Sequence, residues 1–167
     1  ISNIQINNLS IKNGDGERGG GMFISKSENV SLSGVDIYEN TGDKGGGIHA
    51  LDSHPNLSNV TIENNDANSG RGGGIFIMNS NSDDSSDDEV AVLTGVVIRG
   101  NDVRSEDGTR DDVFGGGVYI DNTSFNFQDV TIEGNNAYGT NARGGAIYSY
   151  SDVATDGRAY SSDGVYG

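Results

Sequence analysis

Residues 57–65 read Leu57-Ser58-Asn59-Val60-Thr61-Ile62-Glu63-Asn64-Asn65, and residues 72–77 read Gly72-Gly73-Gly74-Ile75-Phe76-Ile77. The first block alternates apolar and polar residues from Val60 to Ile62, as a strand with one buried face does. The second block opens with three glycines, which suit a tight corner or a close approach between chain segments, and runs into another apolar strand. The two blocks together predict one unit of a β-structure made of short strands and corners.

Both blocks recur along the chain. The strand block, with a large apolar residue three positions before Val or Leu and Ile two positions after it, occupies residues 6–11, 32–37, 57–62, 93–98 and 127–132. The glycine block follows each time, at residues 19–24, 45–50, 72–77, 115–120 and 144–149. One such repeat cannot bury its apolar face alone, so successive repeats must stack. The sequence therefore predicts an all-β fold, a right-handed parallel β-helix (β-solenoid) of about five coils.

We expect each coil to hold a strand, an Asn-bearing turn, a loop, the glycine corner, a second strand and a third short strand. The repeats predict a single domain over residues 1–150, with loop insertions at about 78–90 and 102–114. Residues 151–167 lose the pattern and predict an irregular tail, a cap or a truncated coil. Because the chain opens in mid-pattern at Ile1, we expect a fragment of a larger exported protein.

The composition restricts the possible partners. The formal net charge is −15, and no basic stripe exists that could displace counterions from phosphates, which argues against nucleic acid and anionic membranes. The chain contains no Cys, and its longest apolar run is far too short to span a bilayer. Only 32% of the residues are hydrophobic, which fits a core one side chain deep along an extended axis.

An asparagine follows the Ile of the last four strand blocks by three residues, at Asn40, Asn65, Asn101 and Asn135. Asn tolerates left-handed backbone and caps local turns, so a plain turn-forming role would explain this spacing. In a stack of coils the four amides could also hydrogen-bond to one another as a ladder. Both interpretations are structural, and neither is catalytic.

Two of these motifs resemble those of a known family. Gly-Gly-Ala-Ile at residues 144–147 and the Ile-x-x-Asn units at 37–40, 62–65, 98–101 and 132–135 resemble the paired Gly-Gly-Ala-Ile and Phe-x-x-Asn motifs of polymorphic outer-membrane protein repeats. This chain has Ile in place of Phe and Gly-Gly-Gly in four of its five glycine blocks, so it also resembles the broader pectate-lyase-like β-helices. The resemblance implies export, surface display and adhesion, although the same scaffold carries polysaccharide lyases and hydrolases.

Alternation in the glycine block points an aliphatic residue inward and the next residue outward. The outward residues form a ring column with one member per coil, made of Phe23, His49, Phe76, Tyr119 and Tyr148. Exposed rings can stack on sugar rings or pack against another domain. The ring column is therefore our candidate binding site, either for a glycan or for a covering loop or partner domain.

A cation directly precedes the glycine corner in four coils. This cation column consists of Arg18, Lys44, Arg71 and Arg143. Cations stacked about 4.8 Å apart repel each other unless carboxylates interleave. The nearby acidic residues are Asp15, Glu17, Asp43 and Asp66, which favours structural charge pairing over a groove for polyanions.

The first insertion is the candidate metal site. Its possible ligands are Asp83, Asp84, Asp87, Asp88 and Glu89. Calcium prefers several carboxylate oxygens, but a charge run without EF-hand spacing is also typical of a solvated loop. No other cofactor is indicated, since His49 and His54 lack the spacing of metal ligands.

No catalytic residue is assigned. A β-helical hydrolase needs carboxylates on neighbouring strands, and Asp36 and Asp66 have no evident partner in the sequence. The nearest arrangement for a lyase is Asp107, Arg110, Asp111 and Asp112.

Our leading hypothesis is a non-catalytic, secreted or cell-surface module for adhesion or structural display, whose partners are a polysaccharide or cell-surface glycan and the rest of the parent protein. The alternative is a carbohydrate-active β-helix, either a glycan-binding domain or a calcium-dependent polysaccharide lyase.

Overall fold

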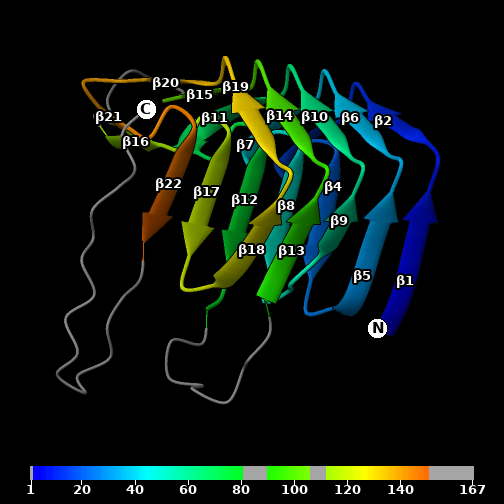
Figure 1. Ribbon diagram of the computed structural model, residues 1–167. Coiled ribbons are helices and arrows are strands. Elements are labelled where there is room, and N and C mark those ends of the chain that lie inside the picture. The colour runs from blue at the N-terminus through cyan, green and yellow to red at the C-terminus, as the bar shows by residue number, and fades with distance from the viewer. Residues whose placement is uncertain (1, 81–89, 106–111, 151–167) are drawn as a thin grey trace, which may run out of the picture.

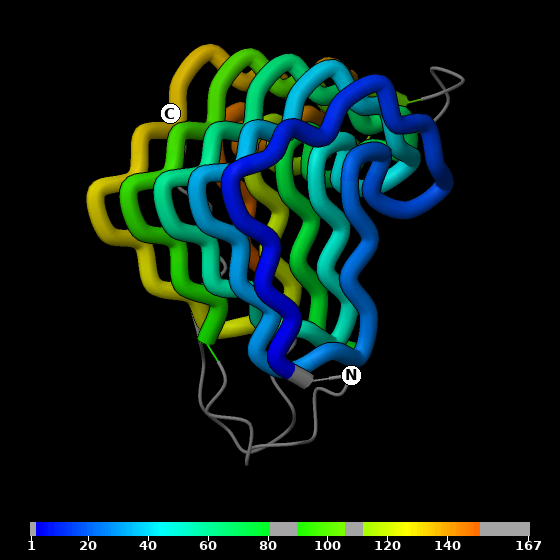
Figure 2. The backbone as a smooth tube through the Cα atoms, turned by 90° about the vertical axis from the view of Figure 1, so that its right-hand side faces the viewer, coloured from blue at the N-terminus to red at the C-terminus, as the bar shows by residue number. Residues whose placement is uncertain are grey.

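The computed structural model describes residues 2–80, 90–105 and 112–150, and each strand pairing that builds its sheets is parallel. Equivalent strands lie side by side along one axis (Figure 1), and successive turns of the chain follow the same path (Figure 2). The described residues form five coils, and each coil contributes at least one strand to each of four sheets. The predicted parallel β-helix is confirmed.

Two sheets come from the strand block, because the chain turns sharply before its central Val or Leu. Sheet A contains β1 (Ser2–Asn7), β5 (Glu28–Ser33), β9 (Asn56–Ser58), β13 (Val90–Thr94) and β18 (Ser124–Gln128). Sheet B contains β2 (Ser10–Lys12), β6 (Asp36–Tyr38), β10 (Thr61–Glu63), β14 (Val97–Arg99) and β19 (Thr131–Glu133). The residue at the turn between them has positive φ, for example 51° at Asn59 and 61° at Gly34.

The other two sheets flank the glycine corner. Sheet C contains β3 (Asp15–Arg18), β7 (Thr41–Lys44), β11 (Asp66–Arg71), β15 (Asp102–Arg104), β16 (Asp112–Phe114), β20 (Asn136–Tyr138) and β21 (Asn141–Arg143). Sheet D contains β4 (Met22–Ser25), β8 (Ile48–Leu51), β12 (Ile75–Met78), β17 (Val118–Asp121) and β22 (Ile147–Tyr150).

Sheet C corrects our expectation of a loop between the Asn turn and the glycine corner. Its strands β7 and β11 are polar, and their inward positions hold the small residues Gly42 and Ala67, so no apolar alternation marks them. Ala67 and Val103 pack there with Val113 in a small second core.

The two predicted insertions connect strands of neighbouring sheets or divide a strand of sheet C. The second one separates β15 from β16, and both of these strands pair with β11 of the preceding coil. The first one lies between β12 and β13. The inner parts of the two insertions, residues 81–89 and 106–111, and the predicted tail, residues 151–167, lie outside the described residues.

The main core is a set of aliphatic lines along the axis. Val35, Val60 and Val96 are at most 1% exposed, and backbone hydrogen bonds from Thr61 to Val35 and from Val97 to Val60 place them directly above one another. Equivalent positions of successive coils therefore stack in register, as the repeats predict.

Glycine at the corner is required by close backbone approach. Gly45 has a φ of +64°, which suits glycine far better than other residues. A Cβ atom on Gly46 would overlap the carbonyl oxygens of Asp66 and Gly73 in the next coil. The glycine triplets thus allow neighbouring coils to meet at the junction of sheets C and D.

The asparagine ladder is confirmed. The Nδ2 atoms of Asn40, Asn65 and Asn101 each donate to the Oδ1 atom of the ladder residue in the following coil, over 2.8–2.9 Å. The positive φ belongs to the residue before each ladder Asn, for example 53° at Asn64, so the turn-forming role falls to that neighbour. In the first coil Gly14 takes the ladder position, and its N–H donates to Asn40 Oδ1.

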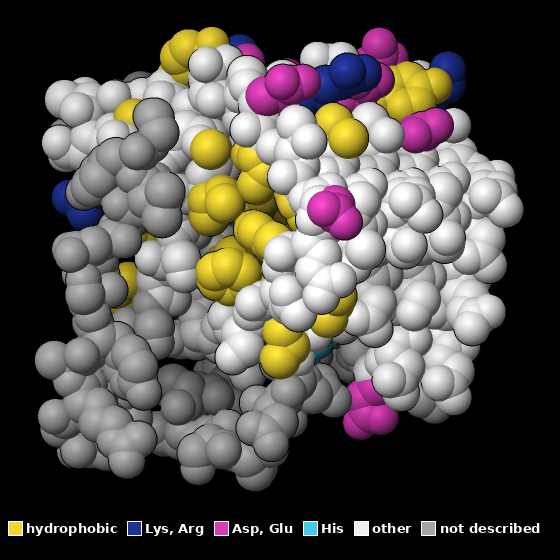
Figure 3. All heavy atoms as spheres, viewed as in Figure 1, with side chains coloured by type: hydrophobic (Ala, Val, Ile, Leu, Met, Phe, Trp, Pro, Cys, Tyr) yellow, Lys and Arg dark blue, Asp and Glu magenta, His cyan; other side chains and the backbone are white. Residues whose placement is uncertain are grey.

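Charged side chains gather over the ends of the sheet B strands (Figure 3). The last residues of the five sheet B strands are register partners, one from each coil: Lys12, Tyr38, Glu63, Arg99 and Glu133. Arg99 forms an ion pair with Glu63 at 2.6 Å, and Lys12 lies 5.6 Å from the ring centroid of Tyr38. Opposite charges therefore alternate along part of this outer row.

Candidate functional site

The ring column lies in register on the outer face of sheet D. Ring centroids of consecutive members are 5.1, 4.6, 5.0 and 5.4 Å apart, so each ring contacts the next. The column exists as predicted, but its middle is not exposed. Phe76 is 1% exposed, and His49 and Tyr119 are 4% exposed, whereas Phe23 at the first coil is 43% exposed.

Side chains from sheet C cover the middle of the ring column. Lys44 Nζ lies 5.8 Å from the ring centroid of Phe76, and Arg71 Cζ lies 5.5 Å from that of Tyr119. The ring of Phe114 packs against Tyr148 with a centroid distance of 4.6 Å. The cations thus sit over aromatic faces, an arrangement that stabilises both groups.

These contacts change the expected role of the cation column. Arg18 lies over Phe23, and Arg143 lies over Phe114, with Cζ 5.6 and 5.9 Å from the centroids. Asp66, which we expected to interleave with these cations, instead pairs with Arg104 at 3.6 Å. Each member of the cation column therefore lies over an aromatic ring, and these rings help to offset the repulsion within the column.

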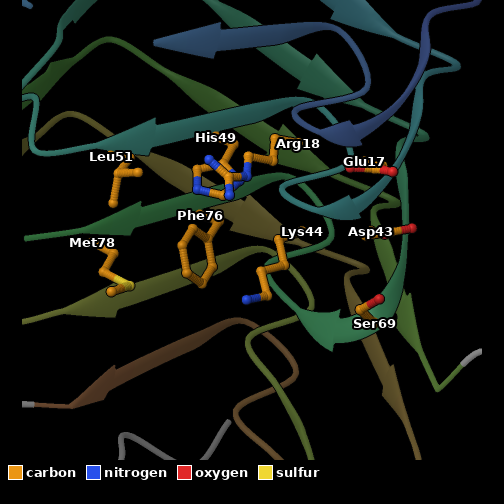
Figure 4. Close-up of a pocket in the computed structure, with 9 residues that line it drawn as sticks. All are labelled: Glu17, Arg18, Asp43, Lys44, His49, Leu51, Ser69, Phe76 and Met78. Atoms are coloured by element: carbon orange, nitrogen blue, oxygen red, sulfur yellow. The ribbon is translucent and has the colours of Figure 1, made fainter. Parts of the chain in front are cut away.

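A cavity of about 370 Å³ lies between sheets C and D over the first three coils (Figure 4). Sheet C provides Glu17, Arg18, Asp43, Lys44 and Ser69, and sheet D provides His49, Leu51, Phe76 and Met78. Leu51 and Met78 lie at one end, Glu17, Asp43 and Ser69 lie at the other, and His49 and Phe76 lie between them (Figure 4). The cavity is therefore apolar at one end and polar at the other.

His49 is the unusual residue of this cavity. We expected a surface ring, but His49 is buried between Phe23 and Phe76. Its burial lowers its pKa to about 4, with further contributions from Lys44 and Arg18, so the imidazole is neutral at pH 7. Within the described part of the chain, its buried Nδ1 atom has no hydrogen-bond partner. Sequence reasoning missed this because burial depends on sheet C, which it did not predict.

Sheet C also brings two carboxylates together. Asp66 and Asp102 are register partners on β11 and β15, and Arg104 contacts both, at 3.6 and 2.7 Å. The pKa of Asp66 is raised above its ordinary value, mainly by burial. The positive charge of Arg104 opposes this rise, and the negative charge of Asp102 adds to it. Our expectation that Asp66 lacks a partner is wrong. Both residues directly follow a ladder Asn, and this shared position could have revealed the pair.

The predicted calcium ligands, Asp83, Asp84, Asp87, Asp88 and Glu89, lie outside the described residues. The same holds for Asp107, Arg110 and Asp111 of the lyase-like set, whereas Asp112 begins β16. Across residues 2–80, 90–105 and 112–150, no group of three or more His, Cys, Asp or Glu is placed to hold a metal ion. The same part of the chain has no helix long and apolar enough to cross a membrane.

The stacked coils, the four parallel sheets and the buried Asn ladder define the class of protein. The chain belongs to the right-handed β-helix family: the family model described as "Right handed beta helix region" matches residues 1–154. The fold is thus an all-β, right-handed parallel β-helix. No curated protein and no solved structure matches the chain.

Proposed function

We propose that this β-helix is a non-catalytic module for adhesion or structural display on the outside of the cell. The observation that carries the proposal is the uninterrupted stacking of five coils by in-register sheets and a buried side-chain ladder. Such a stack is a stiff scaffold whose outer faces and insertions are free to vary. The net charge of −15 favours solubility of an exposed rod.

Antibody labelling of intact source cells tests the exterior location. We expect an antibody against the folded chain to label intact cells as strongly as permeabilised ones. Labelling that requires permeabilisation would contradict the proposal. Beads coated with the chain should retain cells or glycans better than beads coated with a heat-denatured sample, if the module is adhesive.

The alternative is a carbohydrate-active β-helix, and one observation favours it. Asp66 and Asp102 lie on adjacent strands with Arg104 beside them, and the pKa of Asp66 is raised. A pair of carboxylates in which one holds its proton more tightly is the arrangement that glycoside hydrolysis uses.

Incubating the chain with polysaccharides distinguishes a non-catalytic module from a carbohydrate-active enzyme. Parallel samples contain either calcium or a chelator. Hydrolysis releases reducing ends, and a lyase produces unsaturated products that absorb in the ultraviolet. Cleavage that is lost in both Asp66→Asn and Asp102→Asn would establish an enzyme and contradict the non-catalytic proposal. Calcium-dependent cleavage that is lost when Asp84 and Asp87 are both replaced by Ala would support the proposed calcium site.

A further inference from the structure

The outer face of sheet A carries two rows of uncharged side chains. Because side chains alternate along its strands, the buried line of Leu32, Leu57 and Leu93 lies between two lines that point outward. The first outward row pairs in register and consists of Gln5, Ser31, Asn56, Val92 and Asn126. The second row lies beside the turn into sheet B and consists of Asn7, Ser33, Ser58, Thr94 and Gln128. We call these two rows the neutral face.

The neutral face carries no charge, although the formal net charge of the chain is −15. On sheet B, by contrast, the row at the strand ends holds Lys12, Glu63, Arg99 and Glu133. Figure 3 shows this difference, since the surface over β1, β5 and β9 is mostly white and the charged side chains gather over the ends of the sheet B strands. Asn, which is depleted in strands, occupies three positions of the neutral face, so strand formation alone does not explain its composition.

The polar groups of the neutral face are available to a ligand. Each of its side chains is at least partly exposed. Within residues 2–80, 90–105 and 112–150, the only hydrogen bond that these side chains make runs from Asn59 Nδ2 to Ser58 Oγ, at 3.4 Å. An amide supplies donors and an acceptor, and a hydroxyl can act as either. The neutral face can therefore both donate hydrogen bonds to a ligand and accept them from it.

We propose that the neutral face binds an uncharged polysaccharide in an extended conformation, with the sugar chain running along the coil axis. Successive coils are about 4.8 Å apart, which is close to the length of one sugar unit in an extended β-linked chain. Equivalent pairs of side chains would therefore meet successive sugar units. Val92 and the methyl group of Thr94, which both point outward from β13, offer an apolar spot for the C–H groups of a sugar ring. The proposal rests on the proposed adhesive module and names the ligand class of that module.

The charge distribution favours an uncharged polymer over a charged one. The net charge of −15 repels an anionic polysaccharide, and the neutral face holds no cation that could offset this repulsion. A cationic polymer would be drawn to carboxylates outside the neutral face, such as Glu63 and Glu133 on sheet B. An uncharged polymer is neither attracted nor repelled by the net charge, so hydrogen bonding decides where it binds.

Affinity electrophoresis of the full chain tests the proposal, with hydroxyethyl cellulose, galactomannan and carboxymethyl cellulose as probes. Carboxymethyl cellulose shares the backbone of hydroxyethyl cellulose but is anionic, so it is the matched charged probe. We expect at least one uncharged polymer to retard the chain, and carboxymethyl cellulose to bind about tenfold more weakly than that polymer. Retardation by carboxymethyl cellulose that equals or exceeds that of the uncharged polymers, or retardation by none of the three, would overturn the proposal.

The length of the bound sugar chain gives a second measurement. Calorimetric titration with oligosaccharides of the polymer that binds should show an affinity that rises with each added unit, because each coil offers an equivalent pair of side chains. An affinity that is already complete with a single sugar unit would indicate a pocket and contradict binding along the stack.

A double variant assigns the binding to the neutral face. Asn56→Val with Ser58→Val removes the polar groups of the third coil from both rows. Val suits strands, and Val92 already occupies the first row, so the variant should fold with an unchanged melting temperature. We expect about tenfold weaker binding, because two or more hydrogen bonds are lost. Unchanged binding in the folded double variant would overturn the assignment.

Thr61→Val is the matched control. It removes a hydroxyl from an outward position of sheet B in the same coil and should leave binding unchanged. Ser33→Val and Thr94→Val repeat the test in the coils on either side of Ser58, each with an expected loss of a few-fold, and they decide the result if the double variant does not fold.

A second copy of the chain is the other possible occupant of the neutral face. Light scattering would then show a dimer that the double variant abolishes, and this result would overturn the proposal. Binding is measured on the purified chain, so it succeeds or fails separately from the labelling of intact cells.

Discussion

The side-chain Nδ2 of Asn65 donates a hydrogen bond to Oδ1 of Asn101, 2.9 Å away and one coil further along the axis. It also donates to the carbonyl oxygen of Ile37 in the preceding coil, at 3.0 Å. Its own Oδ1 accepts from both the backbone N–H and the Nδ2 of Asn40. One fully buried amide therefore joins three consecutive coils and has its hydrogen-bonding capacity satisfied.

We expect Asn65→Ala to lower the free energy of unfolding by about 3 kcal/mol or more. The substitution removes the acceptor for two donors of Asn40, and it frees the Oδ1 of Asn101 from one of its two donors. A buried donor left unpaired costs about 1–3 kcal/mol. Urea denaturation followed by far-ultraviolet circular dichroism measures the change.

Asn64→Gly is the matched control for this prediction. Asn64 is exposed, has a φ of 53°, and corresponds to Gly100 and Gly134 in the next two coils. Its replacement should change the free energy of unfolding by only about 0.5 kcal/mol. Equal losses in the two variants would mean that the turn, and not the ladder, limits the stability of the coil.

The repeats predicted the stack because chemically similar residues at equivalent positions must form lines when coils lie in register. Val35, Val60 and Val96 therefore lie in the core as expected, and the Asn spacing gives a ladder. The number of strands per coil was not predictable in this way. In β7 and β11 of sheet C the buried inward positions hold residues as small as Gly42 and Ala67, and these strands carry no apolar alternation.

The same gap explains what was missed at the candidate site. The glycine blocks predict that the residues of the ring column pair in register, and the sheet D strands pair in that register. His49 and Phe76 are buried because sheet C lies beside them and Lys44 contacts them. No pattern in the sequence predicted sheet C, so this burial was not predictable. The pairing of Asp66 with Asp102 likewise depends on the register of β11 and β15.

The close backbone approach at the glycine corner gives a second testable prediction. We expect Gly46→Ala to destabilise the fold by about 2 kcal/mol or more, because its Cβ would overlap backbone oxygens that cannot move without shifting a neighbouring coil. Gly16→Ala is the control, since its Cβ would meet its nearest atoms, the carbonyl oxygens of Arg18 and Gly19, at 3.8 Å. Thermal melting of both variants gives the comparison. A Gly46→Ala variant as stable as Gly16→Ala would show that the coils can separate at this corner.

The inward Ile of sheet B gives a third prediction. Ile62 is fully buried, and its register partners are Ile37 and Ile98. We expect Ile62→Asp to unfold the chain, because the charge would be buried without a partner. Thr61→Ser, at the outward position directly before it, should fold normally. Circular dichroism separates the two results, and a folded Ile62→Asp variant would contradict the inward assignment of this line.

The buried His49 makes stability depend on pH in a defined window. Its pKa is lowered from 6.5 to about 4 in the folded chain, so the unfolded chain binds the proton more tightly between these values. The contribution of His49 to stability is therefore complete above pH 6.5 and is lost as the pH falls toward 4, with a slope of at most about 1.4 kcal/mol per pH unit. His49→Phe lacks this proton, and it differs from the wild-type chain at this one residue. The difference in free energy of unfolding between the wild-type chain and His49→Phe should accordingly be constant from pH 7 to 8 and should move in favour of His49→Phe between pH 6.5 and 4. Urea denaturation at a series of pH values measures this difference, and parallel curves for the two proteins would mean that the imidazole takes up its proton as readily in the folded chain as in the unfolded one.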